Sequence, residues 1–224
     1  PTSEGDASAI EVEGHANELR RHRALERIRA SAAALGGYVD LMLIHSPHAP
    51  TAEARVALWL ALEDAQRLGL VHSIGVSNYG AHHLQELLDH PHTSVIPAVN
   101  QMELHPFLTR PQVEALCVSV GIALVAYSPL AKGRRMEHST IRHVARAHDV
   151  SAAQVMIRWA LQRGYVVLPK ASSVLHKVTN LQLHFNLSAT EMARLNELDE
   201  GFITGWDPAS LDLPEGSRMR LRAV

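Results

Sequence analysis

Five short apolar runs, separated by segments of helical periodicity, constrain the fold of this chain most strongly. The runs are Val39–Ile44, His72–Val76, Val95–Val99, Ile122–Tyr127 and Tyr165–Leu168. They are rich in β-branched residues and show little polar alternation, which is typical of strands buried on both faces of a parallel sheet. The segments with helical spacing are Ala52–Leu68, Ala81–Asp89, Arg110–Val120, Ser139–His148 and Ser151–Gln162. Strand and helix alternate, so we predict an α/β fold with a parallel sheet covered by helices.

The ends of these predicted helices carry the residues that commonly begin and stop helices. Ser151 precedes one helix as a predicted N-cap, and Pro111 lies in the first turn of another. Gly69, Gly121 and Gly164 follow helices, where glycine is common. Ahead of the first strand, residues from about 15 to 35 are expected to form one helix, and the short run 9–13 is a possible strand remnant. No linker is evident, so a single domain is predicted over residues 1–224.

Composition and charge narrow the class of protein. The 224 residues are 46% hydrophobic and 20% charged, as in a globular protein, and the net charge of -2 gives no electrostatic reason to expect nucleic acid or an anionic membrane as partner. The single cysteine, Cys117, cannot form an internal disulfide, so a reducing, cytoplasmic location is expected. No membrane span, signal peptide or metal site is predicted. A chain that begins at Pro1 fits either removal of an initiator methionine or a piece of a longer protein.

Polar residues follow every predicted strand. Because the carboxyl ends of parallel strands meet at one face of the sheet, such residues are candidates for a binding site. Any one of them could instead be a strand-end cap or a turn former. Five strands that all end in hydrogen-bonding or charged groups favour a binding site for a polar ligand at this end of the sheet. These strand-end residues are His45, Ser77, Asn78, Asn100, Gln101, Tyr127, Ser128, Pro169 and Lys170.

In order and spacing, these strand ends resemble the aldo-keto reductase family. The matching phrases are YVDLMLIHSP, GLVHSIGVSNYGAHHLQELL, PAVNQMELHPFLTRPQVEALC, IALVAYSPLAKG and the stretch from AAQVMIRW to MARLNEL, which together cover roughly residues 38 to 200. The resemblance implies a (β/α)8 barrel of TIM-barrel type that reduces aldehydes or ketones with hydride from NADPH. The strands present correspond to about the fourth to the eighth of the family, so the barrel is incomplete and residues 1–37 form a divergent helical N-terminal segment.

The resemblance also implies a role for each matching residue. His45 would orient the substrate carbonyl, although a strand-end histidine without such a role remains an alternative. Ser77, Asn78 and Gln101 would hold the nicotinamide carboxamide, since neutral amides supply both donors and acceptors, and Tyr127 would stack on the nicotinamide ring. The remaining predicted cofactor contacts run from the pyrophosphate to the adenosine 2′-phosphate and adenine: Ser128, Leu130, Lys170, Ala171, Ser172, His176 and Asn180. Asp40 and Glu103 are interpreted as structural.

The sequence departs from the family at the proton donor. In the family a tyrosine, a lysine and an aspartate from the first three strands complete the catalytic site, but here no tyrosine precedes Tyr38 and no lysine precedes Lys132. Ser46 stands where an aromatic residue often lines the pocket, Ala171 where a serine is expected, and His176 where a basic residue is expected. Carbonyl reduction is therefore expected to be impaired, and NADH is possible in place of NADPH.

Two alternatives remain open, and one physical consequence follows from the missing strands. The chain could be a non-catalytic nicotinamide-nucleotide binder or partner subunit, or a truncated form. Five strands cannot close an eight-stranded barrel, so the sheet keeps unpaired edges. Self-association through those edges is therefore expected, unless a partner or the N-terminal helix covers them.

Overall fold

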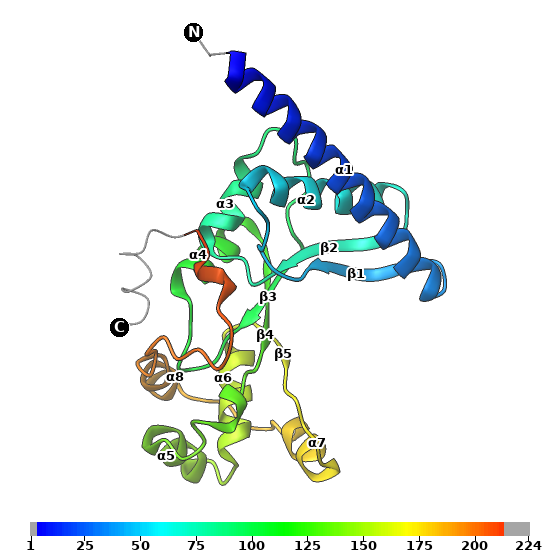
Figure 1. Cartoon of the computed structure of the whole chain (residues 1–224). Coiled ribbons are helices and arrows are strands. Elements are labelled where there is room, and N and C mark those ends of the chain that lie inside the picture. The colour runs from blue at the N-terminus through cyan, green and yellow to red at the C-terminus, as the bar shows by residue number, and fades with distance from the viewer. Residues whose placement is uncertain (1–3, 213–224) are drawn as a thin grey trace. The chain divides into compact units, whose positions relative to one another are not determined.

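A computed structural model describes residues 4–212 of the chain (Figure 1). The chain forms two compact units, Pro1–Val99 and Asn100–Val224. Five strands of the described residues form a sheet in the order β1-β2-β3-β4-β5, so the strands follow one another as they do along the chain. The expected alternation of parallel strands and helices is confirmed. No helix of the described part is both long and apolar enough to cross a bilayer.

The first unit consists of helices and the first two complete strands. Its elements are α1 (Glu4–Ala34), β1 (Val39–Ile44), α2 (Ala52–Arg67), β2 (Val71–Ser77) and α3 (Ala81–Asp89). Strands β1 and β2 pair in parallel, with Val39 opposite Val71 and Ile44 opposite Val76. Helix α2 begins after Thr51, whose hydroxyl accepts a hydrogen bond from the Ala54 N–H at 3.2 Å.

Helix α1 is longer than the sequence indicates, and it lies beside α2 (Figure 1). The run 9–13, a possible strand remnant from its sequence, is helical, so that interpretation is wrong. A partly buried ion pair joins the two helices: Arg21 donates through Nε and Nη2 to both carboxylate oxygens of Asp64, at 2.6 and 2.7 Å. The hydrogen bonds from Arg21 lower the pKa of Asp64 below its ordinary value.

The second unit holds the rest of the sheet and the remaining helices. Strand β3 (Val99–Glu103) begins at the last residue of the first unit. The other elements are α4 (Pro111–Val120), β4 (Ala123–Tyr127), the short 3-10 helix η1 (Ala131–Gly133), α5 (Ser139–Ala147), α6 (Ala152–Gln162), β5 (Val166–Leu168), α7 (Val174–Leu181), α8 (Ala189–Asn196) and η2 (Pro208–Ser210). As predicted, Ser151 caps α6, forming a reciprocal capping box with Gln154.

The third predicted strand is displaced by four residues. It was expected at Val95–Val99, whereas β3 spans Val99–Glu103. The reason lies in the backbone donors of this segment. The carboxylate of Glu63 accepts the N–H groups of Ser94 and Val95 at 2.9 and 3.0 Å, and Pro97 has no N–H to donate. These residues therefore cannot contribute a regular ladder of hydrogen bonds.

Strands β1 and β5 are not buried on both faces, as the apolar runs suggested. Leu41 of β1 and both Val166 and Leu168 of β5 are exposed. These strands lie at the two ends of the strand order, and each pairs with one neighbour among the described residues. Continuous hydrophobicity in a strand therefore does not by itself show that both faces are covered.

Candidate functional site

In the first unit, three of the predicted site residues meet at the carboxyl ends of β1 and β2. His45 directly follows β1, Ser77 is the last residue of β2, and Asn78 comes next. The Asn78 side-chain amide donates to the backbone carbonyl of His45 at 2.9 Å and to the Ser77 hydroxyl at 3.0 Å. Asn78 and Ser77 are buried, whereas the side chain of His45 is exposed. The two strand ends are thus joined by one side chain, with the histidine presented beside it.

The backbone of Asn78 explains why an asparagine suits this position. Its φ of 62° lies in the left-handed region, which costs most L-residues about 1–2 kcal/mol but which asparagine adopts more readily. With the amide oriented as described, both of its N–H donors are used inside the unit. The Asn78 amide therefore holds the two strand ends together.

In the second unit, an aromatic residue and a lysine lie at or just after the carboxyl ends of the paired strands β4 and β5. Tyr127 is the last residue of β4 and lies opposite Leu168, the last residue of β5, so Lys170 follows two residues beyond that level. Tyr127 is half-buried, and burial is the main reason that its pKa is raised above the ordinary value. The phenol of Tyr127 therefore stays neutral.

The loop after β4 has a strained backbone. Ser128, Ala131 and Lys132 all have positive φ values, of 48°, 47° and 51°. Non-glycine residues in this region persist only where surrounding contacts hold them. Ser128 and Leu130, the predicted pyrophosphate contacts, lie within this loop and are half-buried.

The predicted contacts to the adenosine part lie between β5 and the end of α7. Lys170, Ser172 and His176 are exposed, Ala171 is half-buried and Asn180 is buried. The Lys170 ammonium has no hydrogen bond or ion pair to another described residue. Gln101, the remaining predicted contact, is a half-buried residue of β3 between the buried Asn100 and Met102.

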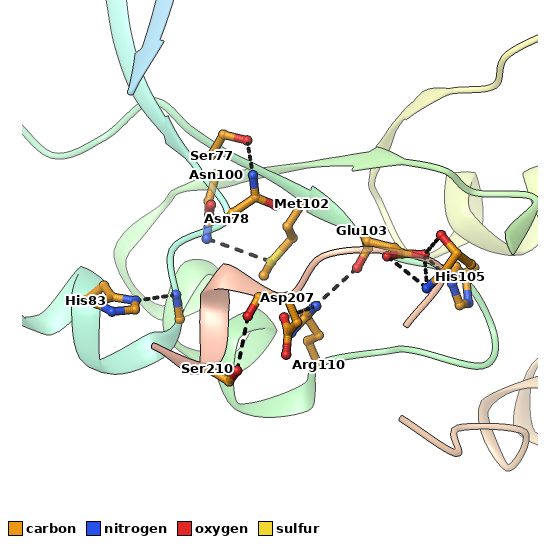
Figure 2. Close-up of polar contacts among 12 residues, drawn as sticks. Ser77, Asn78, His83, Asn100, Met102, Glu103, His105, Arg110, Asp207 and Ser210 are labelled. Carbon is orange, nitrogen blue, oxygen red and sulfur yellow. Dashed lines mark hydrogen bonds and ion pairs between the residues drawn. The ribbon is translucent and has the colours of Figure 1, made fainter. Parts of the chain in front are cut away.

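A buried acid network in the second unit was not predicted from the sequence (Figure 2). The carboxylate of Glu103 accepts hydrogen bonds from the Thr204 N–H at 3.1 Å and the Thr204 hydroxyl at 2.5 Å, and it contacts Nε2 of His105 at 3.1 Å. Burial alone would raise the pKa of Glu103, but these hydrogen bonds outweigh it and lower the pKa below the ordinary value. These contacts to Thr204 and His105 support the interpretation of Glu103 as a structural residue.

Further contacts tie the segment after α8 to the loop that follows β3. Arg110 donates to the carboxylate of Asp207 at 2.7 Å and to the carbonyl of Glu103 at 3.3 Å (Figure 2), and the Thr109 hydroxyl donates to Asp199. Beside this segment lies an open pocket of about 600 Å³ lined by Arg135, Glu200, Gly201, Phe202, Ile203, Gly205, Asp207 and Ser210. None of the predicted site residues lines it. The spacing of Glu103, the last residue of β3, and His105 could have suggested the contact between these two side chains, but no local feature of the sequence indicates Thr204 as their partner.

The fold, with parallel strands in chain order and polar groups at their carboxyl ends, defines an α/β protein of the (β/α)8-barrel type. The solved structure of Gox0644 superposes with a TM-score of 0.77 at 36% identity, over 85% of this chain and 70% of that one. The Bombyx mori aldo-keto reductase AKR2E4, solved in complex with NADP, gives a TM-score of 0.75 at 29% identity, over 87% and 68%.

The family follows from the sequence comparisons. The Aldo/keto reductase family model matches residues 9–200. The uncharacterized oxidoreductase C2F3.05c of Schizosaccharomyces pombe is 43% identical over 195 residues, which cover 86% of this chain and 69% of that protein. The chain therefore belongs to the aldo/keto reductase family, an oxidoreductase family, and the predicted family is confirmed. The chain spans about two thirds of the length of the curated relatives it matches.

Proposed function

We propose that this chain binds NADPH and contributes the histidine part of an aldo-keto reductase site that reduces an aldehyde or ketone. One observation carries the proposal. The Asn78 amide joins the ends of β1 and β2 and so positions His45 beside two predicted carboxamide contacts. The complex of the silkworm relative with NADP supports the same class of cofactor.

The described residues fit a nicotinamide nucleotide. Asn180 is only 8% exposed, yet its side chain makes no hydrogen bond within residues 4–212, so its amide keeps donors and an acceptor for a ligand. Lys170 is a cation without a protein partner in the same part of the chain, which suits a phosphate. Tyr127 presents a neutral ring. When bound, the cofactor would supply the hydride; these residues would hold and orient it.

His45 has a separate task in this proposal. Its exposed imidazole would donate a hydrogen bond to the carbonyl oxygen of the substrate, and its backbone would be fixed by Asn78. The family's tyrosine and lysine have no counterpart ahead of this strand in the sequence. A positioned general acid typically contributes 10²–10⁴-fold, so residues 1–224 purified on their own should reduce a carbonyl at least about two orders of magnitude more slowly than a family member that contains this tyrosine.

A second candidate function is that of a non-catalytic nucleotide-binding or partner subunit, in which the cofactor residues hold a nucleotide without hydride transfer. The two functions share the nucleotide site and differ in whether hydride leaves the cofactor.

The rate of NADPH oxidation in the presence of an aldehyde distinguishes them. The purified chain, His45→Gln and the control His48→Gln, which alters another exposed histidine of the same loop, are compared from pH 5 to 8. We expect a slow rate of NADPH oxidation from the parent chain. It should be abolished by His45→Gln and retained by His48→Gln. A rate that His45→Gln leaves unchanged would contradict the role of His45, and bound nucleotide without any rate would favour the non-catalytic subunit.

A further inference from the structure

Arg55 is a charged residue buried in the first unit, outside the set of predicted site residues. It is the fourth residue of α2 and is only 3% exposed. Arginine is almost never fully buried unless its charge is paired. Its partner is Glu86 of α3: Nε and Nη2 of Arg55 donate to the two carboxylate oxygens, each at 2.8 Å. This planar arrangement of two bonds fixes the direction of the guanidinium as well as its position.

The ion pair joins the two helices that follow the strand ends of the candidate site. Helix α2 follows the loop that begins at His45, and α3 follows the turn that begins at Asn78. Arg55 also donates from Nη1 to the carbonyl of Pro47 at 3.5 Å. That distance is long for a hydrogen bond, so the two bonds to Glu86 hold the guanidinium and the third contact directs it toward the loop after His45.

Tyr79 shows that the ion pair also lies close to the second strand end. Tyr79 directly follows Asn78 and is fully buried. Burial raises the pKa of its phenol, Arg55 lowers that pKa and Glu86 raises it, so both charges lie near the ring. The pair therefore lies beside both of the loops that carry predicted site residues in this unit.

Stability alone does not account for a buried ion pair. The cost of removing two charges from water roughly offsets their attraction, and well-packed apolar side chains are often at least as stabilising in the same place. Apolar side chains cannot, however, fix a backbone carbonyl by a directed bond. Here Asn78 donates to the carbonyl of His45, and Arg55 donates to that of Pro47, two residues further on. The backbone that carries the histidine is thus held at two points.

We propose that Arg55 is a positioning residue for His45, and that its ion pair with Glu86 sets the direction in which the imidazole is presented. The proposal rests on the proposed role of His45 as hydrogen-bond donor to a substrate carbonyl. The side chain of His45 is exposed, so its direction depends on the backbone that carries it. A displacement of about 1 Å in a reacting group can lower a rate by about 100-fold.

The imidazole signals of His45 in NMR spectra of the full chain, assigned as those absent from His45→Gln, test the position directly. Arg55→Lys keeps the charge but replaces the planar fork with a single ammonium group. The double substitution Arg55→Met and Glu86→Met removes both charges, so that neither is left buried and unpaired, which keeps the test open if the lysine variant does not fold. We expect shifted or multiple His45 signals in both variants, with the larger change in the double one.

Two further measurements on the same variants separate position from stability. Hydrogen exchange at the amides of residues 46 and 48 should become faster by roughly tenfold or more. The rate of aldehyde-dependent NADPH oxidation at saturating NADPH should fall by roughly 10- to 100-fold, whereas the affinity for NADPH should change little. A residue that only stabilised the fold would leave this rate unchanged at temperatures where the variant stays folded.

Arg21→Lys is the matched control. Arg21 also makes two bonds to one carboxylate of the same unit, and that carboxylate, of Asp64, is its only polar partner among residues 4–212. The control should leave the His45 signals, the exchange and the rate unchanged. Unaltered signals and exchange in both Arg55 variants would overturn the proposal, as would equal changes in Arg21→Lys or a rate that stays at the parent's value although the signals move. A parent chain without any rate would contradict the proposed function alone, because the NMR and exchange comparisons would still decide whether Arg55 positions His45.

Discussion

Replacing Thr204 tests how firmly the segment after α8 is held by the buried carboxylate of Glu103. In Thr204→Val the side chain keeps its shape and loses the hydroxyl that donates to Glu103 at 2.5 Å. A hydrogen bond to a charged group contributes about 1.5–3 kcal/mol, and here the acceptor is almost fully buried. We therefore expect the substitution to lower the opening free energy of this segment by about 1.5–3 kcal/mol.

The assay is hydrogen exchange at the Thr204 amide, because that N–H itself donates to Glu103 at 3.1 Å. Local exchange isolates the contact without assuming that both units unfold together. Thr179→Val is the control, since the Thr179 hydroxyl donates to Leu175 and His176 carbonyls of its own exposed helix. Thr179→Val should change the opening free energy measured at the Thr204 amide by no more than about 0.5 kcal/mol. Unaltered exchange at residue 204 in Thr204→Val would refute the reasoning.

The same network predicts a dependence on pH. The pKa of Glu103 is lowered on folding, so its stabilisation is fully present above the pKa of an unfolded glutamate, about 4.3. It is lost as pH falls through the lower value of the folded state. The stability difference between the parent chain and Glu103→Gln should therefore shrink from about pH 4.3 downward. A difference that stays constant between about pH 5 and pH 3 would contradict the lowered pKa.

Three further predictions follow from contacts in the two units. Gly75→Ala should cost about 1–3 kcal/mol in urea unfolding, because a Cβ there would lie 2.7 Å from the Val99 carbonyl oxygen, whereas Gly14→Ala, with no atom within 4 Å, should be neutral or stabilising. Asn78→Ala should cost about 2–4 kcal/mol by losing two hydrogen bonds and straining a positive φ, and Asn78→Gly should cost less; equal losses would exclude the strain. Burial raises the pKa of Cys117 to about 11, so a thiol reagent at pH 8 should label it only as urea unfolds the chain, and rapid labelling of the folded chain would contradict its burial.

Local signals in the sequence were sufficient for much of the fold. The bounds of β1 and α3 agree with the apolar run and the helical spacing, and α6 begins at its predicted cap. Strand β3 was misplaced because its start depends on Glu63, about thirty residues earlier, which accepts the amides of Ser94 and Val95. Helices α7 and α8 were missed although Ser173 and Ser188 cap them. Each is only eight residues long, so its sequence spans little more than two helical turns in which to show a periodicity.

The candidate site, too, was predictable from the sequence only in part. Residue types at strand ends, together with the family resemblance, indicated His45, Ser77 and Asn78, but not that the Asn78 amide would bond to the carbonyl 33 residues earlier. The bond between Thr204 and Glu103 spans 101 residues and had no local signal. Contacts of this kind depend on how distant loops meet, so they can be described only from the structure.

Fluorescence titration of the purified chain with NADPH and NADH tests the central claim, which is a nucleotide site with Lys170 at the 2′-phosphate. We expect the chain to bind NADPH and Lys170→Ala to weaken that binding by roughly 10- to 150-fold, the equivalent of about 1.5–3 kcal/mol for a charge-assisted contact. NADH, which lacks the 2′-phosphate, should be little affected, and Lys170→Arg should retain NADPH binding. Failure of the parent chain to bind either nucleotide would contradict the account, and equal losses for both nucleotides in Lys170→Ala would remove Lys170 from the phosphate.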